Sequence, residues 1–573
     1  MTRTPSARVV ALLAVAFAAT PAAAAPTDDV LRVAPPDAAL VLLVRDARGH
    51  ADAVAGSPFA AWFPASALGK QLLAAGDVRR LREAAAPVLV ALGVTPEELL
   101  NDVFGDAVAF AYTPAAPADP AGERALLLVR PRKPETLAKL IDRLNEIQTG
   151  NGEVKAVVRR EHLGEPYFER QKAGGGAEFY AFRGPVFAYS GSEADVRAVV
   201  GRDKTAPPVA DKAPELAAKM ARLGVADALA VLLVNPRPFD AEFRAKTAAA
   251  KPDEEPFLRQ FAEAWAALDA AALYVAVGAD AEVGVALDFR PTALPQTARA
   301  WLTGDRPASA LWPAVPADAL VAVAARFRAA DLLDTVRAVL PVRGKAALDA
   351  SLADTLGPVV GRDRLPLVLD ALGPDWALWL EPPVAGSGPL PAAVGVVRVK
   401  AAGPRAKETQ RAMERAVGFG FQAARVAYNA THADQIELLE TPDGDAVVTS
   451  LVGAKAFPPG VQPAFAFKAG YLVVASTSAA VERFRPPTGD AKGGEAVAAR
   501  VSGPAIREYV RTHRDAIAEM LAAAGRGEKA DVAKQFDQFA AVLEPVERME
   551  ILIRGSESGV RVAVRVKLVK PLK

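Results

Sequence analysis

Short apolar runs follow turn segments in the same order in both halves of the chain. A turn at Pro35–Leu40 leads into the apolar run 41–44, and a similar turn at Pro316–Leu320 leads into the run 321–324. A turn followed by a short apolar run is typical of the entry to a buried strand. We expect each half to begin with such a strand, followed by an amphipathic helix.

A hairpin and a charged helix come next in each half. Both hairpins alternate large and small apolar residues and have Pro- and Gly-rich connectors, which are typical of turns between antiparallel strands. The pattern predicts strands at 107–112 and 125–129 with a helix at 134–146, and strands at 376–380 and 394–399 with a helix at 404–417.

The third block of each half is a β-rich run that leads into a helix. Phe182-Arg183-Gly184 begins it in the first half and Phe467-Lys468-Ala469-Gly470 in the second. The helices begin near Ser192 and Ser478. We interpret both serines as N-caps, because a serine hydroxyl can accept from a free amide in the first turn.

The last block is a long helix followed by a β-hairpin. In the first half, Phe257, Phe261, Trp265 and Leu268 fall on one face at helical spacing. In the second half, residues 560–568 alternate aliphatic side chains with alanine, arginine and lysine. A period of two with a charged opposite face predicts a sheet that is covered on one side only.

Matching triplets and pairs lie 275 residues apart, which indicates a duplication. The matches are Arg259-Gln260-Phe261 with Lys534-Gln535-Phe536, Leu268-Asp269 with Leu543-Glu544, and Gly284-Val285 with Gly559-Val560. We therefore predict a first α+β repeat at 25–292, a Pro-rich linker at 293–314 and a second repeat at 315–573. Each repeat is expected to be an antiparallel sheet with helices packed on one face. The alternative is one continuous curved sheet shared by both copies.

Residues 1–24 are predicted to be a secretory signal peptide. Arg3 and Arg8 form a positive region, residues 9–19 an apolar stretch too short for a stable span, and Ala22-Ala23-Ala24 a cleavage site. The expected location is the periplasm or the extracellular space. The longest later apolar stretch, 264–287, contains three acidic residues, so we expect no transmembrane segment in the mature chain.

Composition excludes several kinds of chemistry. The chain has no cysteine, and therefore no disulfide, thiolate nucleophile or zinc–thiolate site. Its 68 basic and 67 acidic residues nearly cancel, so binding to nucleic acid is not indicated. With 51% hydrophobic residues the chain is typical of a globular protein.

Motifs for catalysis or metal binding have structural explanations. The four histidines, at 50, 162, 432 and 513, are too far apart for an H-E-x-x-H helix. His432 with Asp434 and Glu437 is the nearest approach to a ligand set, and we interpret it as a polar loop before a strand. The segment Gly555–Gly559 has glutamate where a nucleophile elbow needs serine, and it is predicted to be a hairpin turn. We therefore assign no catalytic, cofactor-binding or metal-binding residue and no cofactor.

An aromatic group is the one candidate for a ligand groove. It comprises Tyr167, Phe168, Phe179, Tyr180, Phe182, Phe187 and Tyr189. Such a group could bind an apolar or carbohydrate ligand, but cross-strand pairs of a half-buried sheet explain it better. The second half fills the same block mainly with aliphatic residues.

The recurring opening with proline, Asp and Ala-Leu-Val, the Phe104-Gly105-Asp106 strand start and the late serine-capped helix resemble a family of exported bacterial proteins with a domain of unknown function. The resemblance covers most of the mature chain. It implies export and a repeated α+β architecture, and it supplies no catalytic residues.

Three classes of function remain open. The first is a non-enzymatic envelope protein that binds another envelope protein or a surface component. The second is a carrier that holds an apolar ligand between sheet and helices. The third is a hydrolase without a recognisable motif, which a cleft with converging Ser, His and carboxylate groups would favour.

Overall fold

The computed structural model describes residues 26–569, apart from 67–68, 71–73, 75, 116–121, 206–213, 250, 252–253, 279, 305–306, 385, 400–405, 454 and 488–495. The predicted signal peptide at 1–24 lies outside the described residues. The chain forms two compact units. The smaller comprises Met1–Arg48 with Val88–Lys219, and the larger Gly49–Pro87 with Met220–Lys573. These units do not coincide with the two predicted repeats, whose boundaries stay a prediction.

The smaller unit contains an antiparallel sheet of seven strands in the order β1-β2-β3-β7-β6-β5-β4. Its strands are β1 (Leu40–Arg45), β2 (Ala107–Thr113), β3 (Arg124–Arg130), β4 (Val154–His162), β5 (Glu165–Lys172), β6 (Ala177–Arg183) and β7 (Val186–Ser190). Its helices are α2 (Pro26–Val33), α7 (Pro96–Glu98) with the π-helical turn η1 (Leu99–Val103), α8 (Pro134–Gly150) and α9 (Glu193–Thr205). Three helices span a boundary between the units along the chain: α3 (Ala47–Ala55), α6 (Gly76–Leu92) and α10 (Glu215–Arg222).

The larger unit contains an antiparallel sheet in the order β8-β9-β10-β20-β19-β18-β11-β12-β13-β17-β16-β15-β14. The strands are β8 (Ala230–Val234), β9 (Leu268–Val277), β10 (Asp280–Phe289), β11 (Val321–Arg326), β12 (Leu372–Glu381), β13 (Ala392–Val399), β14 (Glu437–Asp443), β15 (Ala446–Val452), β16 (Ala464–Lys468), β17 (Tyr471–Ala475), β18 (Ala496–Ser502), β19 (Val546–Gly555) and β20 (Gly559–Leu568). Because β10 pairs with β20, strands from both halves of the sequence share this sheet.

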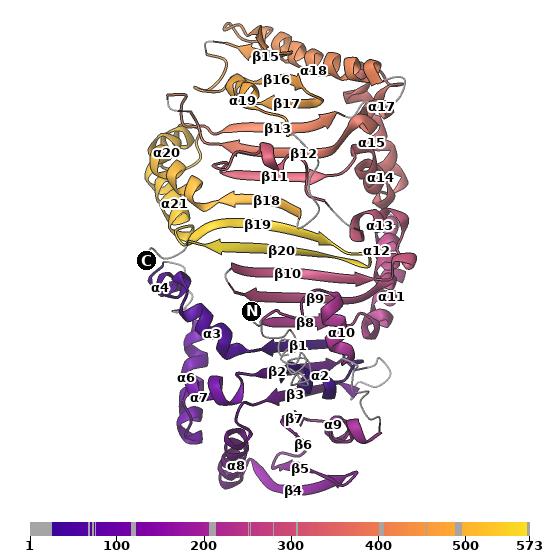
Figure 1. Ribbon diagram of the computed structural model, residues 1–573, viewed down its shortest axis with the longest axis vertical. Coiled ribbons are helices and arrows are strands. Elements are labelled where there is room, and N and C mark those ends of the chain that lie inside the picture. Colours follow the sequence, from indigo (N-terminus) through magenta and orange to yellow (C-terminus); the bar gives the residue numbers. More distant parts are fainter. Residues whose placement is uncertain are drawn as a thin grey trace, which may run out of the picture. The chain divides into compact units, whose positions relative to one another are not determined.

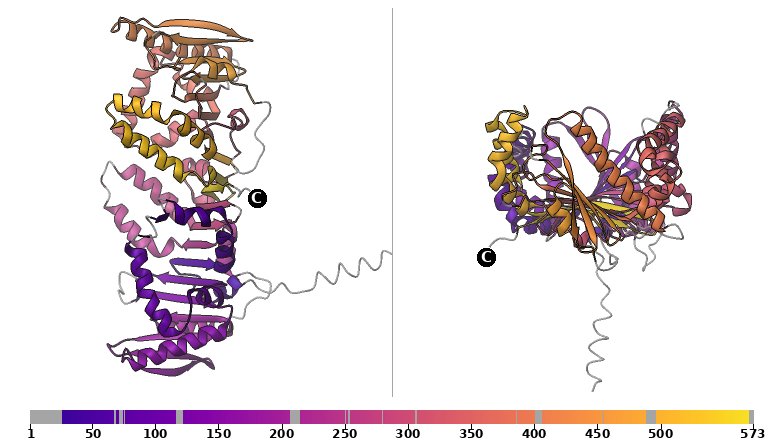
Figure 2. Two further views of the ribbon diagram at one scale, coloured as in Figure 1. Left: turned by 90° about the vertical axis from the view of Figure 1, so that its left-hand side faces the viewer. Right: turned by 90° about the horizontal axis from the view of Figure 1, so that it is seen from above.

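Most helices of the larger unit lie along two margins of its sheet. They are α4 (Pro58–Ala65), α11 (Asp240–Ala248), α12 (Glu255–Ala267), α13 (Gln296–Leu302), α14 (Ala329–Val339), α15 (Val342–Thr355), α16 (Gly357–Val360), α17 (Leu365–Ala371), α18 (Ala406–Asn429), α19 (Ser478–Arg483), α20 (Gly503–Ala523) and α21 (Lys529–Val542). Figure 1 places α12–α15 and α17 along one margin and α20 with α21 along the other. The end-on view in Figure 2 shows both groups on the same side of the sheet.

The α+β class with antiparallel sheets is confirmed, but the expectation that helices cover one face only is wrong. Neighbouring residues of a strand point to opposite faces, and both faces meet helices. In the smaller unit, Asn145 of α8 donates to the Tyr180 hydroxyl at 3.1 Å, whereas the adjacent Ala181 packs against Val196 of α9. In the larger unit, Phe465 meets α18 and Ala466 packs with α19.

Several sequence predictions are confirmed in detail. The predicted helix at 134–146 lies within α8, and the one at 404–417 overlaps α18, which continues to Asn429. The segment Gly555–Gly559 is the turn between β19 and β20, where the Ser556 amide donates to the Gly559 carbonyl at 2.8 Å. The segment 293–314 contains α13 and the fully buried Leu311, and its role as a linker between repeats stays a prediction.

Two local predictions are wrong. The cap of α19 is Thr477, whose side chain accepts from the Ala480 amide at 3.2 Å, while Ser478 is the first helical residue. The long helix α12 carries the predicted aromatic stripe but ends at Ala267, so Leu268 begins β9. Within the described residues, no helix is both long and apolar enough to cross a membrane.

Candidate functional site: an open apolar face of the larger sheet

One face of the larger unit's sheet carries a continuous row of aliphatic side chains, which we call the aliphatic row. Residues that stand directly opposite each other in antiparallel strands point to the same face. Followed from β9 to β17, directly paired residues are Val275, Val283, Val564, Ile551, Ala499, Val323, Leu378, Gly395 and Val474. Strands lie about 4.8 Å apart, so the row extends over roughly 40 Å.

The middle of this face is open. Val283 and Leu378 each retain 56% of their accessible surface, and Val323 retains 44%. Central strands of a sheet usually bury such side chains against another layer. A contiguous exposed apolar surface in a folded protein marks a binding site for a ligand, a membrane or another protein.

Helices cover the same face at the two ends of the strands. On one margin, Ile506 and Val510 of α20 pack against Val321 and Val501, each two positions along the strand from a member of the row. On the other margin, Val368 of α17 and Met413 of α18 pack against Leu372, Val399 and Phe467. The aliphatic row is therefore the floor between two helical margins.

The row ends where α18 crosses the sheet. Phe465 of β16 stands opposite Val474, the last member of the row. Its ring lies 4.6 Å from the ring of Phe421 on α18, and Phe465 is buried. The helix thus closes this end of the open face.

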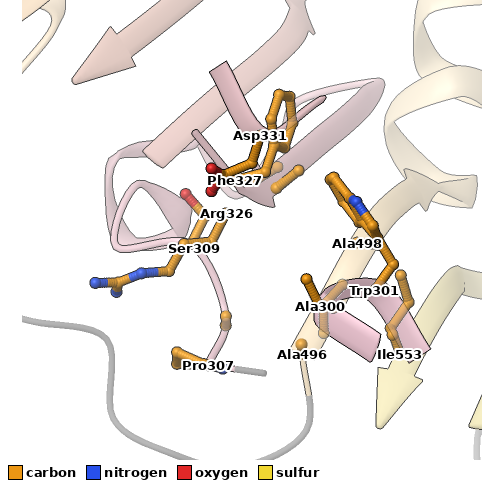
Figure 3. A pocket seen from close by; sticks show the side chains of 14 residues that line it. Ala300, Trp301, Pro307, Ser309, Arg326, Phe327, Asp331, Ala496, Ala498 and Ile553 are labelled. Atoms are coloured by element: carbon orange, nitrogen blue, oxygen red, sulfur yellow. The ribbon is translucent and has the colours of Figure 1, made fainter. Parts of the chain in front are cut away.

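A cavity of about 370 Å³ opens beside the row, where β11 and β18 separate. The pairing of the two strands ends at Val323 opposite Ala499. Beyond that point, Ala324–Phe327 and Ala496–Ala498 line the cavity together with Trp301 of α13 and Ile553 of β19, as Figure 3 shows. The volume is within the range of small-ligand sites.

The walls of the cavity are held by stacking and hydrogen bonds. The Trp301 indole donates to the Thr335 hydroxyl at 2.7 Å, and its ring centroid lies 6.2 Å from that of Phe327. Phe327 in turn stacks on Trp376 at 5.3 Å with nearly parallel rings. Aromatic pairs at these distances are favourable, so this wall is preorganised.

The polar edge of the cavity is tied to a buried carboxylate. Asp375 is fully buried and accepts from the Ala310 amide at 2.9 Å. Its carboxylate also lies 3.8 Å from the Arg326 guanidinium and 3.4 Å from that of Arg398. These groups satisfy one another, so Asp375 is compensated, and the cavity lining combines alanine and aromatic side chains with Ser309 and Asp331.

Electrostatics distinguish the two faces of the β10–β20 pair. On the face of the sheet that points away from the aliphatic row, Glu282 accepts from the Tyr274 hydroxyl at 2.6 Å and from Arg565 at 3.0 Å. Burial, together with the hydrogen bond to Glu282, raises the pKa of Tyr274 above its usual range. The polar groups of these strands are therefore held on the other face, and the open face offers a ligand mainly apolar contact.

The histidines occupy separate elements. His50 lies on α3 and its Nδ1 is 3.1 Å from the Val277 carbonyl oxygen. His432 stacks on Tyr428 at 4.0 Å, and its Nδ1 is 3.1 Å from the Tyr428 carbonyl oxygen. Among the residues that the structure describes, no three histidine or carboxylate side chains are grouped so that they could hold a metal ion.

The aromatic group forms cross-strand pairs in the smaller unit. Phe168 stands opposite Tyr180 with stacked rings 4.9 Å apart, and Phe182 stands opposite Phe187 at 5.1 Å. These side chains pack on α8, while Tyr167 lies on the other face near α9.

The alternation at 560–568 predicts that one side of the sheet is covered, but it does not reveal the aliphatic row. The covered side is the charged one. Ala563 is 3% exposed, whereas its neighbours Val562 and Val564 are 42% and 40% exposed. One sequence signal points to the row. In both halves, short strands carry large aliphatic residues at every second position and alanine at positions between them.

The chain matches no protein-family model, no curated protein and no solved structure.

Proposed function

We propose that the protein is a binding protein that holds an apolar, chain-like ligand, such as a lipid acyl chain, along the aliphatic row. The observation that carries this proposal is the exposure of large aliphatic side chains in the centre of the sheet, Val283, Val323 and Leu378 above all. Covering such surface is favourable by about 25 cal/mol per Å² of apolar area. A row of side chains without polar groups provides this energy along its whole length.

The shape of the face favours a narrow ligand over a second sheet or a bulky domain. The aliphatic row is long, and helices stand along both margins on the same side of the sheet. A chain-like molecule can lie on this floor and meet the cavity beside Trp301, whose wall there is aromatic. Valine, isoleucine, leucine, alanine and glycine contribute contact and no proton transfer, so the role we propose is binding and not catalysis.

The test is binding of a fluorescent acyl-chain probe to the purified full chain. Val283→Glu and Val564→Glu place a carboxylate on the floor, and each should weaken probe binding at least tenfold because burying a charge against a hydrocarbon chain is unfavourable. Leu439→Glu is the matched control. Leu439 is 50% exposed on β14 and stands opposite Ser450, on the other face of the sheet.

Unchanged probe affinity in both floor variants would refute the proposal. An envelope protein or surface component is the alternative occupant of the same surface, and the experiment separates the two. If the wild-type protein does not bind the probe but binds a partner protein, and Val283→Glu abolishes that binding, the face is a docking site for a protein and not for a lipid.

We propose also that the protein is exported to the periplasm or beyond and that residues 1–24 are removed. The order of a basic segment, an apolar segment and an Ala-x-Ala site supports this. N-terminal sequencing of the mature protein should begin at Ala25, and an intact Met1 would contradict it.

We propose further that the two sequence halves are homologous α+β repeats. Support comes from the strand order β1-β2-β3-β7-β6-β5-β4 in the smaller unit, which recurs as β11-β12-β13-β17-β16-β15-β14 in the larger. Superposition of these two sets of seven strands tests the proposal, and different paths of the matched strands would contradict it. This architecture also agrees with the resemblance to exported bacterial proteins.

A further inference from the structure

A second cavity, of about 340 Å³, lies within the smaller unit between α8 and the strands β3, β5, β6 and β7. Leu127 and Phe187 are among the apolar side chains that line it. Asn145, Arg170 and Tyr180 are among the polar ones. Its size is within the range of small-ligand sites, and its lining combines an apolar wall with several polar groups.

Two of the lining residues are buried polar groups whose hydrogen bonding is incomplete. Asn145 is 9% exposed and donates to the Tyr180 hydroxyl at 3.1 Å, but its Oδ1 has no hydrogen-bond partner in the described structure. Arg170 is 6% exposed and donates through Nη1 to Glu178 at 2.7 Å, while its Nε has no partner there. Unpaired buried polar atoms are costly and need an explanation.

The charges around the cavity are compensated internally. Glu178 accepts from both Arg170 and Lys172. Tyr189 also forms a hydrogen bond with Glu178, and burial, followed by this bond, raises the pKa of Tyr189 to about 12. An anionic ligand would have to compete with Glu178 for Arg170, so the arrangement suits a neutral ligand.

The corresponding place in the larger unit shows that the fold does not need these polar groups. β16 lies between β15 and β17 as β6 lies between β5 and β7. There Phe465 occupies the position of Tyr180 and stacks on Phe421 of α18 at 4.6 Å. By the same register, Leu451 and Pro463 stand where the smaller unit has Arg170 and Glu178.

The corresponding strand positions thus carry apolar side chains in one unit, and in the other they carry Arg170, Glu178 and Tyr180 beside a cavity. Buried polar residues cost free energy unless all their hydrogen bonds are made. Departures from a consistent core are expected at functional sites. The polar cluster is therefore better explained by binding than by folding.

We infer that this cavity binds a small, neutral, polyhydroxylated molecule, the size of one sugar unit. A hydroxyl group both donates and accepts, so it can pair with an amide oxygen, a guanidinium N–H and a tyrosine hydroxyl. The C–H face of a sugar ring can pack on Phe187 and Leu127. The inference rests on the smaller unit alone and is independent of the proposed apolar ligand of the larger unit.

The test is calorimetric titration of the full chain with glucose, galactose, mannose and N-acetylglucosamine. Disaccharides and longer oligosaccharides form a second arm that separates a free sugar from a glycan end. Tyr180→Phe reproduces the residue of the larger unit and should weaken binding about tenfold through loss of a hydroxyl hydrogen bond. Asn145→Leu should abolish binding, provided that circular dichroism shows the wild-type fold.

Gln171→Ala is the control. Gln171 is next to Arg170 on β5 but points to the other face, where its amide donates to Glu169 at 3.1 Å. Its binding should equal that of the wild type. Saturable binding of none of the sugars, affinity unchanged by Tyr180→Phe, or binding of the anionic sugar galacturonate in preference to galactose would each overturn the inference.

Discussion

Ala286 of β10 and Arg561 of β20 stand directly opposite each other in the antiparallel pair that joins strands of the two sequence halves. They are also 275 residues apart, the same offset that relates the matching sequence blocks. Ala286 and its match by this offset, Arg561, therefore face each other across the two strands. The flanking pairs are arranged symmetrically about them: Val285 is opposite Val562, and Leu287 is opposite Val560. This is the pattern of a local two-fold axis.

A two-fold pairing of this kind joins two strands into one sheet through the same kind of strand edge on both sides. Equivalent strands of two repeats have the same edge, and an isologous contact places like surface on like surface. At this seam the apolar positions of β10 meet those of β20, so the aliphatic row continues from one sequence half into the other. The relationship supports the proposed duplication and explains why a shared sheet results.

The exposure of the aliphatic row predicts opposite responses at two neighbouring residues of β20. Val564→Thr should change the free energy of unfolding by no more than about 0.5 kcal/mol, because Val564 is 40% exposed. Ala563→Leu should cost about 1–3 kcal/mol through overpacking, because Ala563 is 3% exposed. Urea denaturation of both variants measures the difference. A larger loss in Val564→Thr would mean that the open face is covered in solution.

The contact between Glu282 and Arg565 should stabilise the seam more than a surface ion pair does. Glu282→Gln removes the charged acceptor of Arg565 and Tyr274, whose side chains are largely withdrawn from water, and should cost about 1–3 kcal/mol. The control is Asp354→Asn, because the Asp354–Arg362 pair at 3.0 Å is exposed on both sides and should contribute about 0–1 kcal/mol. Equal losses by denaturant titration would contradict this ranking.

The sequence predicts most elements of the fold because their apolar periodicity is local. The strands at 41–44 and 321–324 and the helices at 134–146 and 404–417 are all present. Strand order and the β10–β20 seam depend on pairings between residues far apart in the chain. No local pattern encodes such pairings, so the choice between separate sheets and a shared one could not be made from the sequence.

The candidate sites were harder to predict, for a different physical reason. In the sequence, a valine in an alternating strand looks the same whether its side chain is buried or exposed. Val473 is buried under another layer, whereas its neighbour Val474 is exposed on the open face. In the same way, an arginine in a strand such as β5 gives no sign in the sequence of whether it is exposed to solvent or, as Arg170 is, buried beside a cavity. Tertiary packing alone decides these outcomes.

The cap of α19 gives a local test of the structure. Thr477→Ala should destabilise the protein by about 0.5–2 kcal/mol, because the Thr477 side chain accepts from the Ala480 amide. Ser478→Ala should cost less than about 0.5 kcal/mol, since Ser478 is inside the helix and its hydroxyl donates to the Gln462 side chain at a long 3.3 Å. The reverse order in thermal denaturation would show that Ser478 is the cap.

The polar residues around the cavity of the smaller unit, Glu178 above all, should make the protein's stability depend on pH. Burial alone would raise the pKa of Glu178, but hydrogen bonds from Lys172 and Tyr189 and the charges of Lys172 and Arg170 outweigh it, so the pKa lies below its ordinary value of 4.5. A carboxyl with a lowered pKa stabilises the fold above its unfolded pKa and loses that contribution as pH falls through the folded pKa.

Wild-type stability should therefore decline as pH is lowered from about 5 through the lowered pKa of Glu178. The interaction with the buried Arg170 is one cause of the lowered pKa, so its weakening on protonation is part of this same loss. Glu178→Gln should be less stable than the wild type at pH 7, and the difference between the two proteins should shrink toward low pH. Denaturant titrations of both chains at several pH values measure it. A difference that stays constant from pH 7 to pH 3 would show that Glu178 does not titrate with folding.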